Sequence, residues 1–141
     1  MIKRICSIKR FIATALMSFC CLPMVCHAIE PNPNTPTYQY SYYNMDSVGN
    51  TVWRDKFSIE TKVYVNPTEG PALIYTVQGG ASKNATTGNN RSTPMQISSG
   101  EKIGITNDFI LSGEIYARLY LQRTVTGQVY TRGLWNPDAL E

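Results

Sequence analysis

From residue 38 onward, the chain consists of short segments in which apolar and polar side chains alternate, separated by turns rich in Pro, Gly and Asn. Alternation with a period of two turns one face of a strand toward a core and the other toward water. No stretch of ten or more residues has the spacing of an amphipathic helix. The pattern therefore predicts an all-β domain with antiparallel strands.

Seven segments carry the strand pattern. The predicted strands cover residues 38–43, 51–65, 73–77, 94–97, 102–106, 115–122 and 128–135. In the second strand, Phe57 and Ile59 are predicted to face the core and Lys56 to face water. Asn66–Pro71 is predicted to interrupt the secondary structure between the second and third strands. Phe109–Leu111 is predicted to extend the fifth strand.

The connections complete the predicted fold. Ser98–Glu101 has the composition of a tight turn, and Thr124–Gly127 is predicted to join the last two strands as a hairpin. Gly79–Thr93 is predicted to be a long exposed loop, and Gly79-Gly80 to serve a turn. Short strands at regular spacing predict one antiparallel β-sandwich of about seven strands with immunoglobulin-like architecture. A small barrel is the alternative.

The chain divides into three predicted parts. Residues 1–28 begin with four basic residues and no acid, and continue with an apolar run, Phe11–Val25. This is the pattern of a secretory signal, with cleavage after Ala28. The run is shorter than the roughly 20 residues of a membrane span, although an uncleaved anchor is the alternative. Ile29–Thr37, with three prolines, is predicted to be an extended arm, and residues 38–141 to be the domain, with residues 136–141 capping its surface.

All four cysteines and the only histidine lie within the predicted signal: Cys6, Cys20, Cys21, Cys26 and His27. The mature chain, residues 29–141, therefore has no disulfide, thiolate nucleophile or imidazole base, and lacks the ligands that zinc, copper and haem prefer. We expect no metal and no cofactor. A small exported domain without disulfides indicates a bacterial protein, located in the periplasm or at the cell surface.

Charge and acidic residues narrow the function further. The full chain has a formal charge of +3, but loss of the signal leaves nine basic and ten acidic side chains, a charge of −1. Such a chain has no general attraction for nucleic acid. Most acidic residues stand beside Gly, Pro or Asn in predicted turns, and no spacing indicates the two convergent carboxylates of a glycosidase. We therefore expect no enzymatic activity.

Aromatic side chains provide the first candidate site. The mature chain contains nine Tyr, two Trp and two Phe. In the predicted hairpin, Tyr120 faces Gly133, and Arg118 faces Trp135. The candidate binding face comprises Tyr116, Arg118, Tyr120 and Trp135, on which a sugar ring or a partner side chain could stack.

The second candidate site is the stripe formed by Tyr38, Tyr40 and Tyr42 on one face of the first strand. An exported arm followed by an alternating segment fits strand addition to a neighbouring subunit, the mode used in pilus assembly. The mature chain differs from a standard pilin of that kind, because it has no disulfide and no alternating aromatic pattern at its C-terminal end.

Together these features predict an exported, non-enzymatic protein that is a subunit of a surface structure or an adhesin-like binding module. Its expected partner is a protein or a glycan at the cell envelope, with self-association included, and it has no membrane span after signal cleavage. One alternative is a soluble periplasmic inhibitor or assembly chaperone that acts through Gly79–Thr93. Another is a small carboxylate-based hydrolase.

Overall fold

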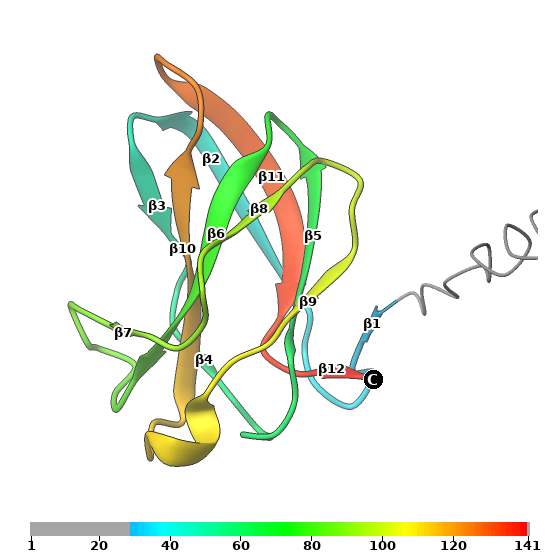
Figure 1. Ribbon diagram of the computed structural model, residues 1–141, viewed down its shortest axis with the longest axis vertical. Coiled ribbons are helices and arrows are strands. Elements are labelled where there is room, and N and C mark those ends of the chain that lie inside the picture. Colours follow the sequence, from blue (N-terminus) through cyan, green and yellow to red (C-terminus); the bar gives the residue numbers. More distant parts are fainter. Residues whose placement is uncertain (1–28, 141) are drawn as a thin grey trace, which may run out of the picture.

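The computed structural model describes residues 29–140, which form an all-β structure of antiparallel strands and one 3-10 helix (Figure 1). The predicted signal and its cleavage point after Ala28 lie outside the described residues. Within residues 29–140 the sheets stay open rather than closing into a barrel. No helix in this range is long and apolar enough to cross a membrane.

Two main sheets and one small sheet make up the structure. The first sheet has the order β3 (Val48–Asn50), β10 (Tyr116–Arg123), β6 (Leu73–Gly80) and β7 (Asn89–Asn90), with β4 (Arg54–Asp55) also paired to β10 and β8 (Met95–Ile97) to β6. The second has the order β2 (Tyr38–Met45), β11 (Val129–Asn136), β5 (Val63–Glu69) and β9 (Ile103–Ile105). The small sheet pairs β1 (Glu30–Pro31) with β12 (Ala139–Leu140), and the 3-10 helix η1 covers Phe109–Leu111.

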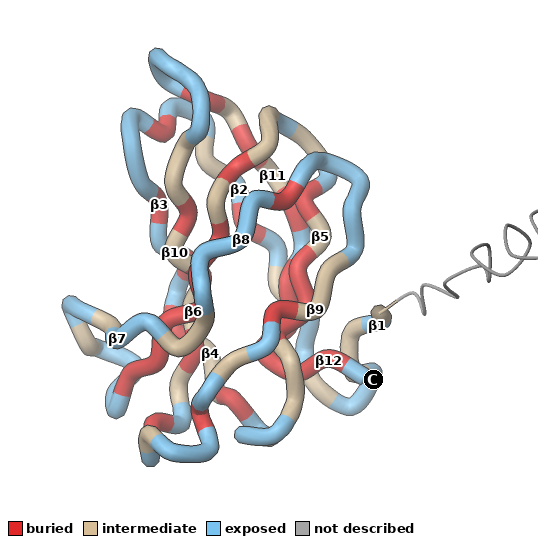
Figure 2. The backbone as a smooth tube through the Cα atoms, viewed as in Figure 1, coloured by how far each residue is buried: buried red, intermediate tan, exposed pale blue. Residues whose placement is uncertain are grey.

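One hydrophobic core receives side chains from both main sheets. Leu119 of β10 and Val77 of β6 meet Val65 of β5 in this core, and all three have no exposed surface. The hydroxyl oxygens of Tyr40 in β2 and Tyr75 in β6 lie 2.8 Å apart and link the two sheets. Figure 2 shows buried segments along the long strands of both main sheets and exposed stretches in many of the connections.

The strands with the clearest alternation are confirmed. Strands β2, β6 and β10 form where residues 38–43, 73–77 and 115–122 predict them, and in β10 the apolar residues are buried while their neighbours are half-buried. Ile115 is the exception, because it precedes β10 and is exposed.

The predicted long strand over residues 51–65 is wrong. Only β4 and β5 form within it, and turns and bends occupy most of the segment between them. Lys56, predicted to face water, is buried. Phe57 and Ile59, predicted to face the core, are 63% and 41% exposed. The reason is an ion pair between Lys56 and Asp138, which folds the segment around the C-terminal tail. The tail is correspondingly not a surface cap, since Asp138 is fully buried.

The predicted break at Asn66–Pro71 begins too early, because β5 continues to Glu69 and the chain turns at Gly70, where φ is 107°. Strand β9 pairs only with Val63–Val65, so Pro67 lies where β5 has a single neighbour. A strand edge without a partner accommodates the missing N–H of proline. Pro67 also lies at a shift of register with β11, which is a further place where proline is tolerated.

The tight turn predicted at Ser98–Glu101 forms, with the Glu101 N–H donating to the Ser98 carbonyl, but the hairpin predicted at Thr124–Gly127 does not. Strands β8 and β9 form as expected, but β8 pairs with β6 and β9 with β5, so the chain crosses between sheets at this point (Figure 1). Likewise β10 lies in the first sheet and β11 in the second. Phe109–Leu111 forms η1 instead of extending β9, Gly79 and Gly80 belong to β6, and the proline-rich arm contributes β1.

Candidate functional site: a groove beside strand β2

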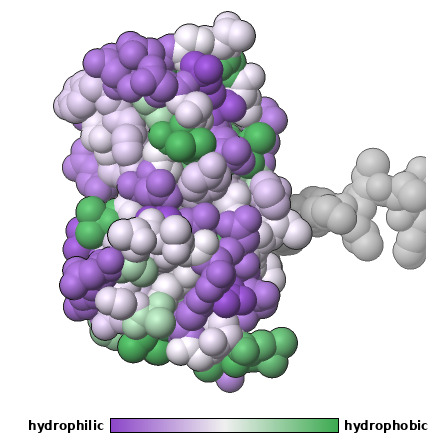
Figure 3. All heavy atoms as spheres, turned by 90° about the vertical axis from the view of Figure 1, so that its left-hand side faces the viewer, coloured by the Kyte–Doolittle hydropathy of each residue, from purple (hydrophilic) through white to green (hydrophobic). Residues whose placement is uncertain are grey.

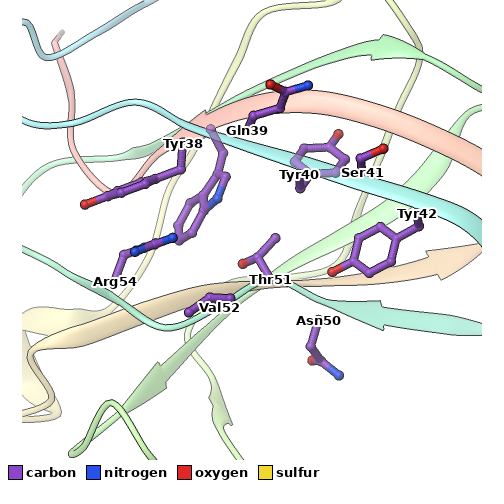
Figure 4. Close-up of a pocket in the computed structure, with 10 residues that line it drawn as sticks. Tyr38, Gln39, Tyr40, Ser41, Tyr42, Asn50, Thr51, Val52 and Arg54 are labelled. Carbon is purple, nitrogen blue, oxygen red and sulfur yellow. The ribbon is translucent and has the colours of Figure 1, made fainter.

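A groove of about 290 Å³ separates β2 at the edge of the second sheet from β3 and β4 of the first sheet. We call it the β2 groove. Figure 4 shows its lining, with the tyrosines of β2 across from Thr51, Val52 and Arg54. The segment that contains these three residues runs from β3 into β4. Neither β3 nor β4 pairs with β2, so the groove lies between strands of different sheets.

Strand β2 contributes its predicted tyrosine stripe to this groove. Tyr40 is buried and Tyr38 and Tyr42 are half-buried, whereas Gln39 and Ser41 between them are exposed. The alternation follows from the period of a strand. The structure thus brings all three residues of the predicted strand-addition stripe to one site.

The ring of Tyr38, at one end of the groove, is held between Arg54 and Trp135. The guanidinium carbon of Arg54 lies 4.1 Å from the centre of the Tyr38 ring, and the Tyr38 and Trp135 rings are 6.0 Å apart at an angle of 44°. A cation over an aromatic face is attracted by the electron-rich face of the ring. Arg54 therefore closes this end of the groove and holds Tyr38 in place.

Three tyrosines, Tyr40 and Tyr42 of the groove and Tyr75 beneath it, are weaker acids than a tyrosine in water. Burial raises the pKa of Tyr40 and of Tyr75 well above the ordinary value, and burial raises the pKa of Tyr42 to about 12. All three phenols stay protonated at neutral pH, since loss of their protons would place charge in an apolar setting. The groove thus offers two half-buried tyrosines, Tyr38 and Tyr42, and one cation, Arg54.

The backbone of β2 adds hydrogen-bonding capacity. Strand β2 pairs with β11 on one side, and within residues 29–140 no strand pairs with its other side. An edge strand of this kind presents unpaired N–H and C=O groups to another chain. A groove of about 290 Å³ is at the lower limit of pockets that enclose a drug-sized ligand. It is better matched to side chains of an added strand.

The predicted face of Tyr116, Arg118, Tyr120 and Trp135 does not form as a unit. Tyr116, Arg118 and Tyr120 stand half-buried on the outer side of β10. Trp135 is 1% exposed and lies in the second sheet, where it pairs with Tyr38 and Val65. Trp135 would stand beside the other three only in a β10–β11 hairpin, and these strands lie in different sheets.

The aromatic partner of Arg118 is Trp53, which sequence reasoning missed. The guanidinium carbon of Arg118 lies 4.4 Å from the Trp53 ring, and its Nε donates to Gln78 Oε1 at 2.9 Å. Trp53 itself is buried and donates from Nε1 to the Ala85 carbonyl at 2.7 Å. A Cβ on Gly80 would lie 3.0 Å from this ring, so the glycine of β6 makes room for it. The pair Gly79-Gly80, interpreted as a turn, was the available signal.

The side of the molecule that carries β3 is largely hydrophilic, with separate hydrophobic areas that are most extensive at its lower end (Figure 3). Exposed apolar residues of the chain include Leu111 at 89% and Phe57 at 63%. These two residues belong to η1 and to the connection between β4 and β5, whereas Val52, which is 66% exposed, lines the β2 groove.

A second, more open hollow of about 410 Å³ is lined by residues 90–93 and 106–108. Asn107 Oδ1, a buried oxygen of its lining, accepts no hydrogen bond. Beside it, Arg91 Nε donates to Glu114 Oε2 at 2.5 Å, and this bond holds the pKa of Glu114 below its ordinary value. Neither hollow is lined by two carboxylates, and the described residues hold no cluster of three or more side chains suited to a metal ion.

No known family model matches the chain, and no curated protein matches it. The β2 groove and the edge strand that borders it are therefore the features of the molecule that indicate its class.

Proposed function

We propose that this chain is an exported, non-enzymatic protein of the cell envelope, a subunit of a surface structure or an adhesin-like binding module. Its partner adds a strand to β2 and places side chains in the β2 groove. One observation carries the proposal: within residues 29–140, β2 is an edge strand that pairs on one side only, and its three inward tyrosines line a groove between the sheets. Strand addition combines backbone hydrogen bonds with pockets for alternate side chains.

The fold that we propose is an immunoglobulin-like β-sandwich. Two antiparallel sheets with a shared core support it, as does the contact between Tyr40 and Tyr75 across that core. Sandwiches of this type keep edge strands at both sides, and an edge that is neither covered nor charged is a natural place for a partner.

A polypeptide partner is favoured over a glycan at the β2 groove. The free groups along β2 are backbone donors and acceptors, which an extended polypeptide satisfies at regular intervals. A sugar would depend on exposed ring faces, whereas Tyr40 is buried and the face of Tyr38 is covered by Arg54.

Hydrogen exchange tests strand addition directly. Backbone amides of β2 should exchange more slowly in the assembled envelope fraction than in the free mature chain at a dilution where it is monomeric, because the added strand accepts their hydrogen bonds. Strand β9 at the opposite edge of the same sheet is the internal control. Equal exchange of β2 in both samples would contradict the proposal.

Cell fractionation tests the class of protein. A surface-bound or polymeric form whose N-terminus is Ile29 is the expected result. A free periplasmic monomer would favour the alternative of an inhibitor or assembly chaperone that acts through Gly79–Thr93. In that case, substitutions in the exposed part of this loop, rather than in β2, should abolish complex formation.

The outer face of β10 is a second candidate surface, for a sugar ring or a partner side chain. Tyr116 and Tyr120 remain partly accessible there on either side of Arg118. Lys83 lies 5.6 Å from the Tyr116 ring and gives the surface a cation. Replacing Tyr116 and Tyr120 by Ala should weaken glycan binding and leave exchange at β2 unchanged, if this face is used.

A further inference from the structure

The edge strands of this protein differ sharply in length. Five of the six edges of the main sheets are strands of two or three residues: β3, β4, β7, β8 and β9. The sixth is β2, with eight residues. Short edges are one of the means by which proteins avoid pairing with other chains. Within residues 29–140, β2 is therefore the one long edge of the main sheets that another chain could extend.

Strand β2 also lacks the side chains that usually keep an edge strand from pairing with another chain. Its sequence, YQYSYYNM, contains no charged residue and no proline, the two side-chain features that most often block an edge. Strand β4 at the edge of the other sheet, by contrast, consists of Arg54 and Asp55. One irregularity remains in β2, since Tyr43 and Asn44 together face a single residue of β11. Such a bulge ends regular pairing, which leaves Tyr38–Tyr42 as the regular edge.

We infer that the occupant of this edge is a second copy of the same chain, whose β2 pairs antiparallel with the first across a twofold axis. This inference rests on the proposed function, namely strand addition at β2, and names the partner. A neutral strand is compatible with its own copy, whereas a charged one would meet like charges directly opposite. The mature chain also has a formal charge of only −1, so two copies repel each other weakly.

The twofold pairing would join the two second sheets into one continuous sheet. Antiparallel pairing of the two Tyr38–Tyr42 edges sets tyrosine beside tyrosine on the inner face and Gln39 near Ser41 on the outer face, because inner and outer residues alternate. Aromatic pairs across strands are favourable. The contact is isologous, the arrangement that closes a dimer instead of extending a fibre.

Sedimentation velocity of the mature chain over a range of concentrations tests the inference. We expect a reversible dimer. Two charged variants, Q39K/S41K and Q39E/S41E, should each weaken association by about tenfold or more, because like charges then face each other across the axis. An equimolar mixture of the two variants should restore a dimer, whatever the exact register. Both positions are exposed, so thermal unfolding should show that the variants still fold.

Two control variants separate β2 from other surfaces. S99K alters an exposed turn, and L111K alters the more exposed of the two exposed apolar residues of η1; both should leave the dimer intact. A wild-type chain that stays monomeric, a dimer that persists in both charged double variants, or a dimer lost in L111K would each overturn the inference. Strand addition would survive the first result if β2 still gained protection in the envelope, because the partner would then be a different protein. It would fail if β2 gained no protection.

Discussion

Lys56 Nζ lies 3.2 Å from Asp138 Oδ1, and neither side chain has any exposed surface. The two residues are 82 positions apart in the sequence. Asp138 also accepts backbone hydrogen bonds from Phe57 and Ser58, and Lys56 donates to the carbonyls of Thr61 and Pro137. The pair therefore joins the connection between β4 and β5 to the C-terminal tail.

Removing either partner should strongly destabilise the fold. Lys56→Met or Asp138→Asn leaves a buried group without its partner, and we expect each to lower the free energy of unfolding by about 3–5 kcal/mol. The double variant should lose less than the sum of the two single losses, because the residues act together. Urea unfolding of the four proteins measures this coupling.

The pair formed by Lys83 and Asp55 is the control. Its separation is similar at 3.3 Å, but its side chains are 59% and 43% exposed. Lys83→Met should change stability by about 1 kcal/mol or less. Strictly additive losses at Lys56 and Asp138 would show that the buried pair is not a unit.

The buried tyrosines predict a loss of stability in alkaline solution. Burial raises the pKa of Tyr40 and Tyr75 above the ordinary value of 10.0. The unfolded chain releases these protons near pH 10 and the folded chain holds them, so their contribution is complete below pH 10 and is lost as pH rises above it. Alkaline unfolding followed by tyrosinate absorbance should show this decline.

The double variant Y40F/Y75F removes both hydroxyls together and should flatten the decline above pH 10. Replacing both members of a hydrogen-bonded pair leaves neither one unsatisfied. Tyr43→Phe, at an exposed position of β2, is the matched control and should leave the pH dependence unchanged. An unchanged decline in the double variant would mean that other groups control alkaline stability.

Gly133 of β11 should tolerate no side chain. It faces Tyr40 of β2, and a Cβ at this position would lie 2.6 Å from Tyr40 Cζ and 2.8 Å from the Asn66 carbonyl oxygen. Gly133→Ala should therefore lower stability by roughly 1–3 kcal/mol through overpacking. In a Tyr40→Leu background the added loss should shrink without vanishing, since the backbone contact to Asn66 remains. Equal losses in both backgrounds would contradict the predicted clash.

Trp135 and Arg118 should behave differently on substitution. Trp135 fills the core, so Trp135→Ala should lower the free energy of unfolding by about 3–5 kcal/mol. Arg118→Ala removes a half-buried side chain from the outer face of β10 and should preserve the fold. Chemical denaturation separates the two cases, and comparable losses would mean that Arg118 is a structural residue.

The alternation of side chains predicted most strands but failed over residues 51–65, and it predicted the pairing of strands poorly. In β10, buried Ala117, Leu119 and Leu121 repeat with a period of two, and this period reports burial directly. Nothing in Thr124–Gly127 indicates whether the next strand returns beside β10 or crosses to the other sheet. That choice depends on core contacts between residues far apart in the sequence.

Only part of the candidate site could be predicted from the sequence. The stripe of Tyr38, Tyr40 and Tyr42 follows from alternation within a single strand, and the structure places it in the β2 groove. Arg54 could not be assigned to the groove, because it comes from the opposite sheet and its position depends on how the sheets face each other. Lys56 was misplaced for a related reason, since its partner Asp138 is distant in sequence.

The antiparallel pairing of β1 with β12 sets Glu30 opposite Leu140. Domains whose ends meet in this way tolerate circular permutation. A short linker from Leu140 back to Ile29 would close the described part of the chain, and new ends opened between Val125 and Thr126 would fall in an exposed connection outside the strands of that part. It also follows that a surface tether attached at either end would hold the protein at the same point.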